Sequence, residues 1–112
     1  MNLIYCYDAW CGWCYGFSPV IKKIEAHFKD KLHVEVLSGG MILPQQPNAI
    51  GVMAPYIQQA YKTVEEYTGI KFGEDFLWHV THPDETDWFP DSTKSAIALC
   101  IFKGVSHDLG KL

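Results

Sequence analysis

The hydrophobic pattern of the first forty residues predicts two strands separated by a helix. Asn2–Tyr7 is a short apolar run with aromatic and β-branched members, which is typical of a buried strand. In the second segment, Leu32, Val34 and Val36 alternate with His33, Glu35 and Leu37, which predicts a second strand. Gly39 and Gly40 follow and are expected to end it.

Between these strands, apolar residues recur at intervals that place them on one face of a helix from about Trp13 to Phe28. Pro19 is expected near the helix start, where the first N–H groups lack helical partners and proline is tolerated. Strand, helix and strand form a βαβ unit, which requires parallel strands and a right-handed crossover. The helix face expected in the core consists of Phe17, Ile21, Ile24 and Phe28.

The rest of the chain predicts helices joined by loops. Met41–Gly51 contains prolines and ends in glycine, so it is expected to be a loop. A helix is expected over 55–69, with Pro55 in its first turn, Gly69 at its end and a core stripe formed by Ile57, Tyr61 and Val64.

Two further helices are expected in the last third of the chain. They are predicted over 73–80 and 92–104, separated by an acidic loop at 81–91. The last helix is expected to begin and end at residues suited to caps, namely Asp91 or Ser92 and Gly104.

Composition narrows the possible partners. The 112 residues carry a formal charge of −4 and contain no arginine, so no nucleic-acid partner is expected. No apolar run approaches the roughly 18 residues of a membrane span, so no membrane partner is expected. The start of the chain lacks a signal-peptide pattern, which favours a cytoplasmic location, where structural disulfides are rare.

Two cysteines lie between the first strand and the helix, within the segment "YDAWCGWCYGF". This spacing places Cys11 at the helix N-terminus, where unpaired N–H groups and the helix dipole favour a thiolate. A CxxC beside a βαβ unit in a cytoplasmic protein is typical of a thioredoxin-like redox motif. Cys11 is therefore expected to be an exposed nucleophile, and Cys14 a shielded thiol that resolves the mixed disulfide.

The neighbours of the pair are expected to shape the site. Gly12 and Trp13 lie between the cysteines and should set their redox poise. Asp8 could transfer a proton to or from Cys14, although bonding of loop N–H groups is its expected role. The residues expected at the rim of the site, where an apolar surface suits unfolded polypeptide, are Trp10, Gly12, Trp13, Tyr15 and Phe17.

Zinc binding is the chemical alternative, because two cysteines can supply half of a four-ligand zinc site. Such a site would need two more cysteine or histidine ligands. Cys6 and Cys100 lie in apolar runs, where a free cysteine usually behaves as a small hydrophobic residue. His79 and His82 precede several acidic residues in what is expected to be a solvated loop. No second CxxC is present, so neither a metal nor a cofactor is predicted.

The segments "YCYDAWCGWCYGFSPVI", "VEVLSGGM", "VEEYTGIKFGEDF" and "FPDSTKSAIALC" resemble the DsbA family of thiol–disulfide oxidoreductases, and within it the cytoplasmic FrnE-like branch. The resemblance implies an α/β chain: the N-terminal βαβ half of a thioredoxin-like fold at 1–40, then part of a helical insertion domain at 41–112. It also implies that Cys11 attacks and Cys14 resolves. Related kappa-class glutathione transferases and hydroxychromene-carboxylate isomerases have serine at the first cysteine, so Cys11 argues against that branch.

The chain departs from the family pattern in two respects. Many thioredoxin-fold proteins have a buried acid six residues before the first cysteine, and this position is Tyr5 here. The family also implies a second half with a cis-proline loop, a hairpin and a final helix, which this chain does not show. The resemblance therefore implies a truncated chain with an open strand edge, and predicts a dimer or completion by a partner chain.

The expected function is that of a thiol–disulfide oxidoreductase or disulfide isomerase acting on protein or small disulfides. A thiol would supply the electrons, and a reducing cytoplasm favours reduction or isomerisation over net oxidation. Two alternatives remain open at this point. One is a catalytically weak module that binds peptides or a partner through the aromatic rim, and the other is a zinc-binding domain.

Overall fold

The computed structural model describes residues 1–43, 45 and 48–105. It confirms a mixed α/β chain that starts with a βαβ unit and continues with helices. The elements, in chain order, are β1 (Asn2–Tyr7), α1 (Gly12–Phe28), β2 (His33–Ser38), α2 (Ile50–Thr68), α3 (Glu74–Thr81) and α4 (Ser92–Val105).

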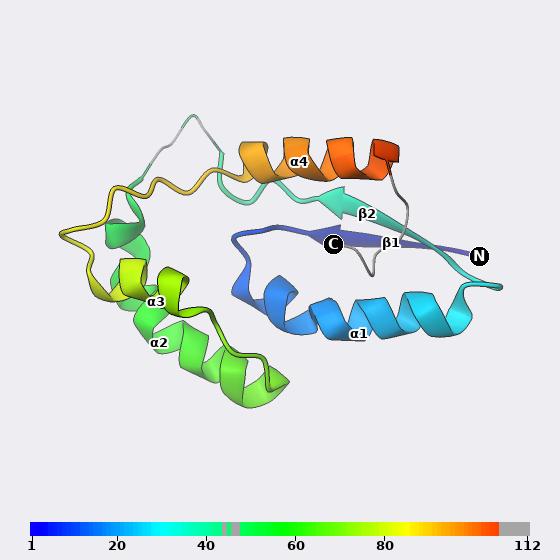
Figure 1. Cartoon of the computed structure of the whole chain (residues 1–112), viewed down its shortest axis with the longest axis horizontal. Helices are drawn as coiled ribbons and strands as arrows, with labels where there is room; N and C mark the ends of the chain where they lie inside the picture. Colours follow the sequence, from blue (N-terminus) through cyan, green and yellow to red (C-terminus); the bar gives the residue numbers. More distant parts are fainter. Residues whose placement is uncertain (44, 46–47, 106–112) are drawn as a thin grey trace.

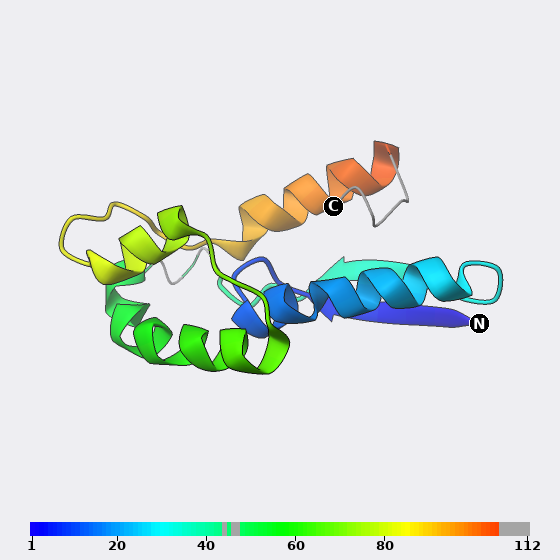
Figure 2. The same ribbon diagram turned by 60° about the horizontal axis from the view of Figure 1, so that its bottom comes forward.

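The two strands pair in parallel, as the βαβ prediction requires, from Asn2 opposite His33 to Tyr7 opposite Ser38. The sheet lies between α1 and α4, which occupy opposite sides of it (Figure 1). Helices α2 and α3 pack side by side beyond the C-terminal ends of the strands (Figure 2). The turn between β1 and α1 therefore lies where the sheet meets the helical region.

The core around the sheet is small. Val36 of β2 and Leu99 of α4 are buried against each other, and side chains of both strands pack around them. Lys103 holds α4 to β2 through an ion pair with Glu35 and a 2.8 Å hydrogen bond from its Nζ to the Val36 carbonyl oxygen. Alternation along β1 leaves Ile4 61 % exposed, so this strand is half-buried and the expectation of a fully buried strand is wrong.

Close contact between α1 and α2 depends on a glycine. A Cβ atom built on Gly16 would lie 2.7 Å from Thr68 Cγ2 and 3.1 Å from Val64 Cγ1. Thr68 cannot easily move away, because its Oγ1 donates to the Val64 carbonyl oxygen at 2.7 Å and accepts from the Ile70 N–H at 3.2 Å. Glycine at position 16 thus sets the distance at which the two helices cross.

Replacing Gly16 with alanine is therefore expected to destabilise the chain by about 1–3 kcal/mol, the usual cost of overpacking. Gly104 of α4 is the matched control, because a Cβ there meets nothing within 4 Å. Gly104→Ala should stabilise by roughly 0.5–1 kcal/mol through helix propensity. Urea unfolding of both variants measures the two effects. Changes of the same sign in both variants would contradict the steric explanation.

Helix α2 begins at Ile50, so the prediction of a loop to Gly51 and a start at Pro55 is wrong. Ile50 is fully buried, and its N–H donates to the Trp88 carbonyl oxygen at 2.9 Å. The first N–H groups of a helix have no acceptor within the helix, and the Trp88 carbonyl oxygen supplies one for Ile50. Pro55 consequently lies inside the helix.

Pro19 also lies inside its helix rather than near the start. A proline has no N–H to donate to the carbonyl four residues earlier, which here belongs to Tyr15. The Ser18 hydroxyl donates to that Tyr15 oxygen at 2.7 Å instead. The side chain before the proline therefore replaces the missing backbone bond, and α1 continues to Phe28.

Several predicted core positions lie at the surface. Phe17 and Phe28 are 43 % and 45 % exposed, whereas Ile21 of the same predicted face is buried, as expected, together with Gly16. Cys6 and Cys100 are also exposed, so the expectation that they act as core residues is wrong.

The predicted helix ends are largely confirmed. Gly69 ends α2 in the left-handed conformation, with φ of 73°. The Asp91 carboxylate accepts the Thr93 N–H at 2.8 Å at the start of α4. Gly104, in contrast, lies within α4, which continues to Val105.

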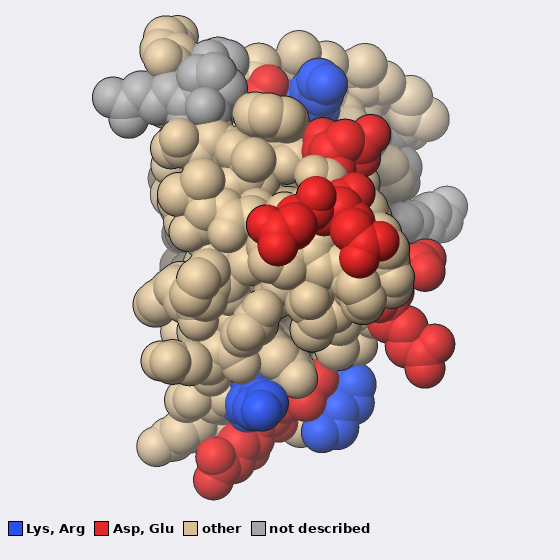
Figure 3. Space-filling model, turned by 90° about the vertical axis from the view of Figure 1, so that its left-hand side faces the viewer, with Lys and Arg blue, Asp and Glu red and all other residues tan. Residues whose placement is uncertain are grey.

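The acidic loop after α3 is solvated, as predicted. Asp84, Glu85 and Asp87 are exposed. Figure 3 shows several acidic side chains gathered on this end of the molecule. Over the described residues, every helix is too short or too polar to cross a lipid bilayer.

Candidate active site

Cys11 is the N-cap residue of α1, as the sequence predicted. Its backbone is extended, and its Sγ accepts the Cys14 N–H at 3.4 Å. Its own N–H donates to the Asp8 carbonyl oxygen at 3.1 Å, which closes the turn after β1. A backbone N–H directed at sulfur, at the positive end of a helix, stabilises negative charge on that sulfur.

Both cysteines of the motif are free and half-buried, so the expected contrast between an exposed Cys11 and a shielded Cys14 is absent. Burial raises the pKa of the Cys14 thiol above its ordinary value of 9.0, and the hydrogen bond with Cys11 raises it further. A backbone hydrogen bond from Asp8 and the Tyr5 hydroxyl act in the opposite direction. The raising effects are larger, so Cys14 is a thiol at neutral pH. The Asp8 backbone and the Tyr5 hydroxyl would stabilise its thiolate.

A cavity of about 660 Å³ opens beside Cys11, between the start of α1, helix α2 and the segment before α4. We call it the aromatic cavity. The predicted rim residues Trp10, Gly12, Trp13 and Tyr15 line it. Aromatic residues from distant segments complete the wall of the cavity, and the sequence analysis did not predict them: Tyr56, Phe72, Phe76 and Trp88.

A second hollow, of about 590 Å³, lies beside Cys14 and is called the Cys14 groove. Phe17, the remaining predicted rim residue, lines this groove with Tyr5 and Tyr67. Trp13 lines both hollows and is 50 % exposed, with its ring edge-on to that of Tyr67 at 6.2 Å. The dithiol thus lies between two apolar hollows.

Phe72 packs closely against the turn between the two cysteines because position 12 is glycine. A Cβ on Gly12 would lie 3.3 Å from Phe72 Cζ. The Phe72 ring also packs on Tyr15, with 5.2 Å between the ring centroids. A side chain at position 12 would therefore push this wall of the aromatic cavity away from Cys11.

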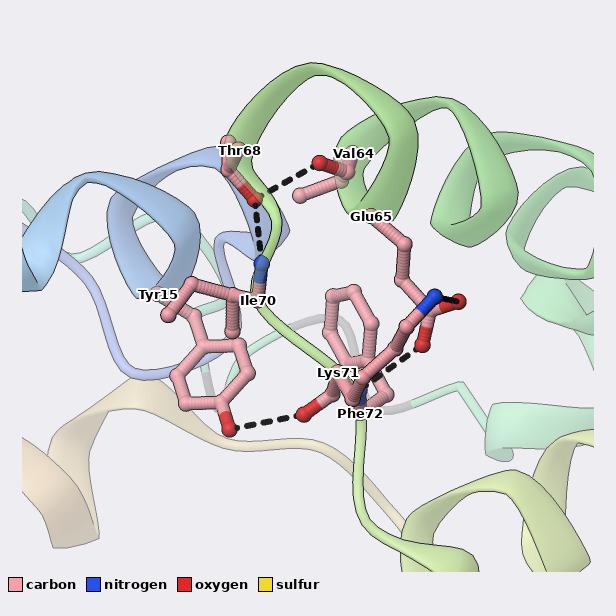
Figure 4. Close-up of polar contacts among 7 residues, drawn as sticks. All are labelled: Tyr15, Val64, Glu65, Thr68, Ile70, Lys71 and Phe72. Atoms are coloured by element: carbon pink, nitrogen blue, oxygen red, sulfur yellow. Dashed lines mark hydrogen bonds and ion pairs between the residues drawn. The ribbon is translucent and has the colours of Figure 1, made fainter.

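A carboxylate fixes the turn that carries Phe72 (Figure 4). Glu65 accepts the Phe72 N–H at 2.9 Å and the Lys71 Nζ at 3.3 Å, while the Tyr15 hydroxyl donates to the Lys71 carbonyl oxygen at 3.1 Å. The Phe72 N–H and, more weakly, Lys71 lower the pKa of the Glu65 carboxyl. These bonds tie the turn both to α2 and to α1.

Asp8 is buried and bonds loop N–H groups, as expected. Its Oδ1 accepts from the Trp10 N–H and the Ser92 hydroxyl, each at 2.9 Å, and its Oδ2 accepts from the Met41 N–H at 2.8 Å. Ser92 in turn accepts the Ile42 N–H at 2.9 Å. Asp8 therefore connects the cysteine turn to the segment after β2 and to the start of α4.

The two histidines considered as zinc ligands have other contacts. His79 Nδ1 lies 2.7 Å from Thr86 Oγ1, and its ring stacks on Trp88 at 3.7 Å. His82 Nδ1 lies 2.9 Å from the Trp78 carbonyl oxygen at the end of α3. Within residues 1–43, 45 and 48–105, no group of three or more histidine, cysteine or acidic side chains is placed to hold a metal ion.

No protein-family model matches this chain, and no curated protein matches its sequence. Among solved structures, it is similar to the cytosolic disulfide reductase DsbM from Pseudomonas aeruginosa, with 28 % identity and a TM-score of 0.75 over 96 % of this chain. It is also similar to a Nitrosomonas europaea protein described as a disulfide isomerase, with 30 % identity and a TM-score of 0.53 over 66 % of this chain.

The chain spans 48 % of the first of these proteins and 34 % of the second. The match to the first protein extends over nearly the whole chain, so it takes in both the βαβ unit and the helical segment. In its fold, the chain is therefore similar to thiol–disulfide oxidoreductases that combine a thioredoxin-like βαβ start with a helical insertion.

Proposed function

We propose that the chain carries the redox dithiol of a thiol–disulfide oxidoreductase or disulfide isomerase, with Cys11 as the attacking thiol and Cys14 as the resolving thiol. The observation that carries this proposal is the position of Cys11. Its sulfur caps α1, accepts the Cys14 N–H and lines the aromatic cavity. A substrate disulfide in this cavity would meet a sulfur whose negative charge the helix start stabilises.

The reaction proceeds in two exchanges that conserve electrons. The Cys11 thiolate attacks one sulfur of the substrate disulfide, forms a mixed disulfide and releases the first substrate thiolate, which takes up a proton. Cys14 loses its proton and attacks the Cys11 sulfur, which releases the second substrate thiolate. The dithiol has then become a disulfide and the substrate two thiols. A thiol reductant returns the Cys11–Cys14 disulfide to the dithiol.

The substrate class follows from the walls of the site. The aromatic cavity and the Cys14 groove are both lined mainly by aromatic and aliphatic side chains. Protein disulfides flanked by apolar side chains, or small disulfides with apolar groups, suit such walls. The similar protein DsbM is described as a cytosolic disulfide reductase, which supports reduction in the cytoplasm as the direction and place of this reaction.

A binding module without turnover is the second candidate, and the size of the aromatic cavity favours it. At about 660 Å³, this cavity has the volume of a small-molecule site and can hold side chains of a bound peptide. Binding of this kind would not require Cys14 to be released as a thiolate.

The test oxidises the full chain with a small disulfide and maps the product by mass spectrometry. The proposal expects a disulfide between Cys11 and Cys14, with Cys6 and Cys100 still open to alkylation. It also expects faster reduction of insulin disulfides by a thiol than the thiol achieves alone. Insulin reduction at the background rate, with normal binding of apolar peptides, would favour the binding module instead.

A further inference from the structure

Tyr5 is a polar group at the dithiol that the proposed exchange does not yet use. It lies on the half-buried face of β1, and its ring packs against Tyr7 and Phe17, with centroid distances of 6.4 and 6.0 Å. These contacts direct the phenol toward the first turn of α1, where its hydroxyl lies 3.5 Å from the Cys14 carbonyl oxygen. Tyr5 and Cys14 line the same groove, and the two groups affect each other: Cys14 raises the pKa of the phenol, and the phenol lowers the pKa of the thiol.

We propose that the Tyr5 hydroxyl is a catalytic group of the resolving step, in which it donates a hydrogen bond to the Cys14 sulfur as that sulfur becomes a thiolate. This inference rests on the proposed exchange between Cys11 and Cys14. The phenol has one proton, which it donates to the Cys14 carbonyl oxygen, and the Cys14 side chain lines the same groove as the Tyr5 ring. It can bond the carbonyl while Cys14 is a thiol and turn to the sulfur when negative charge develops there.

The protonation state of Tyr5 suits a donor rather than a base. Burial, and then the neighbouring Cys14, raise the pKa of the Tyr5 phenol to about 12. The phenol therefore keeps its proton throughout the pH range in which thiols exchange. The proton that leaves Cys14 passes to the first released substrate thiolate or to water, not to Tyr5.

Other titratable groups near Cys14 do not replace this donor. Cys11 lies within the same turn and raises the pKa of Cys14 rather than lowering it. The Asp8 carboxylate already accepts three hydrogen bonds, although the Asp8 backbone does favour the Cys14 thiolate. Tyr7 interacts with Cys14 through its charge, and Tyr67, which lines the Cys14 groove, packs edge-on against Trp13.

The experiment replaces Tyr5 with phenylalanine, which keeps the ring contacts and removes only the hydroxyl. Cys11→Ser is combined with it so that Cys14 can be followed alone, and alkylation of Cys14 is measured by mass spectrometry from neutral to alkaline pH. A hydrogen bond to a charged group is lost, so alkylation of Cys14 at pH 8 is expected to slow by about tenfold and its pH profile to move upward. Tyr7→Phe is the matched control and is expected to leave the profile within about twofold.

An unchanged Cys14 profile in Tyr5→Phe, or an equal shift in Tyr7→Phe, would overturn the proposal. A second measurement needs no substitution at Tyr5. The Tyr5 phenol, followed by NMR of labelled tyrosine, should titrate at lower pH after oxidation of the dithiol, because the negative charge of Cys14 is then absent. The same titration in both redox states would also overturn it. Neither measurement requires turnover, so failure here is distinct from failure of the proposed exchange.

Discussion

Serine in place of Cys11 is expected to lower the rate of disulfide reduction by about three orders of magnitude or more, as loss of a nucleophile does in other enzymes. A serine hydroxyl cannot form the mixed disulfide with substrate. Serine is also a favoured N-cap residue, so Cys11→Ser should keep the bond from the Cys14 N–H and the start of α1. A loss of activity with an unchanged thermal unfolding curve therefore measures the chemistry of the sulfur.

Three cysteine variants provide the controls. Cys14→Ser keeps the attacking thiol, so it should form a stable mixed disulfide with substrate that mass spectrometry detects. Cys6→Ser and Cys100→Ser remove exposed thiols outside the two hollows and should retain the wild-type rate. Full activity of Cys11→Ser, or equal losses in the Cys6 and Cys100 variants, would refute the assignment of Cys11.

The largest effect on stability is expected at Asp8, where alanine leaves three donors without their acceptor and should lower the free energy of unfolding by roughly 3–5 kcal/mol. The carboxylate is 4 % exposed and accepts from the Trp10 N–H, the Met41 N–H and the Ser92 hydroxyl. Each donor left buried without a partner costs about 1–3 kcal/mol. Such a loss is a large fraction of the roughly 5–15 kcal/mol that stabilises an ordinary domain.

Urea unfolding of Asp8→Ala and Ser92→Ala measures this effect. Ser92→Ala removes only the bonds that pass through its hydroxyl, so a smaller loss of about 1–2 kcal/mol is expected. Equal losses in the two variants would show that the N–H groups of Trp10 and Met41 find other partners. Asp8→Asn keeps the volume and one acceptor oxygen and should fall between them. If Asp8 also transfers a proton, Asp8→Asn should in addition alter the pH dependence of disulfide reduction.

The elements around the dithiol could be predicted because their signals are local. The apolar run Asn2–Tyr7 and the spacing of apolar residues after Trp13 depend only on neighbours within a short segment. The same holds for the left-handed glycine after α2 and for the Asp91 cap of α4. The position of Cys11 at a helix start follows from these patterns, and the structure confirms it.

The features that the sequence left undecided depend on contacts between distant segments. Ile50 starts α2 because the Trp88 carbonyl oxygen, far along the chain, accepts its N–H. Pro19 stays inside α1 because a serine hydroxyl replaces the bond that proline cannot make. Neither contact can be recognised from the spacing of hydrophobic residues. Helix propensity therefore predicted Pro19 and Pro55 near the helix starts, whereas both lie inside their helices.

A CxxC pair that follows a strand and opens a helix can be recognised from the sequence, since strand and helix patterns are properties of short segments. The surroundings of that pair depend on how distant segments pack. Phe72 reaches Gly12 through a turn held by Glu65, and Tyr5 reaches Cys14 across the start of α1. These approaches depend on how the helical region and the sheet pack against each other, and that packing is the sum of many weak contacts between distant residues.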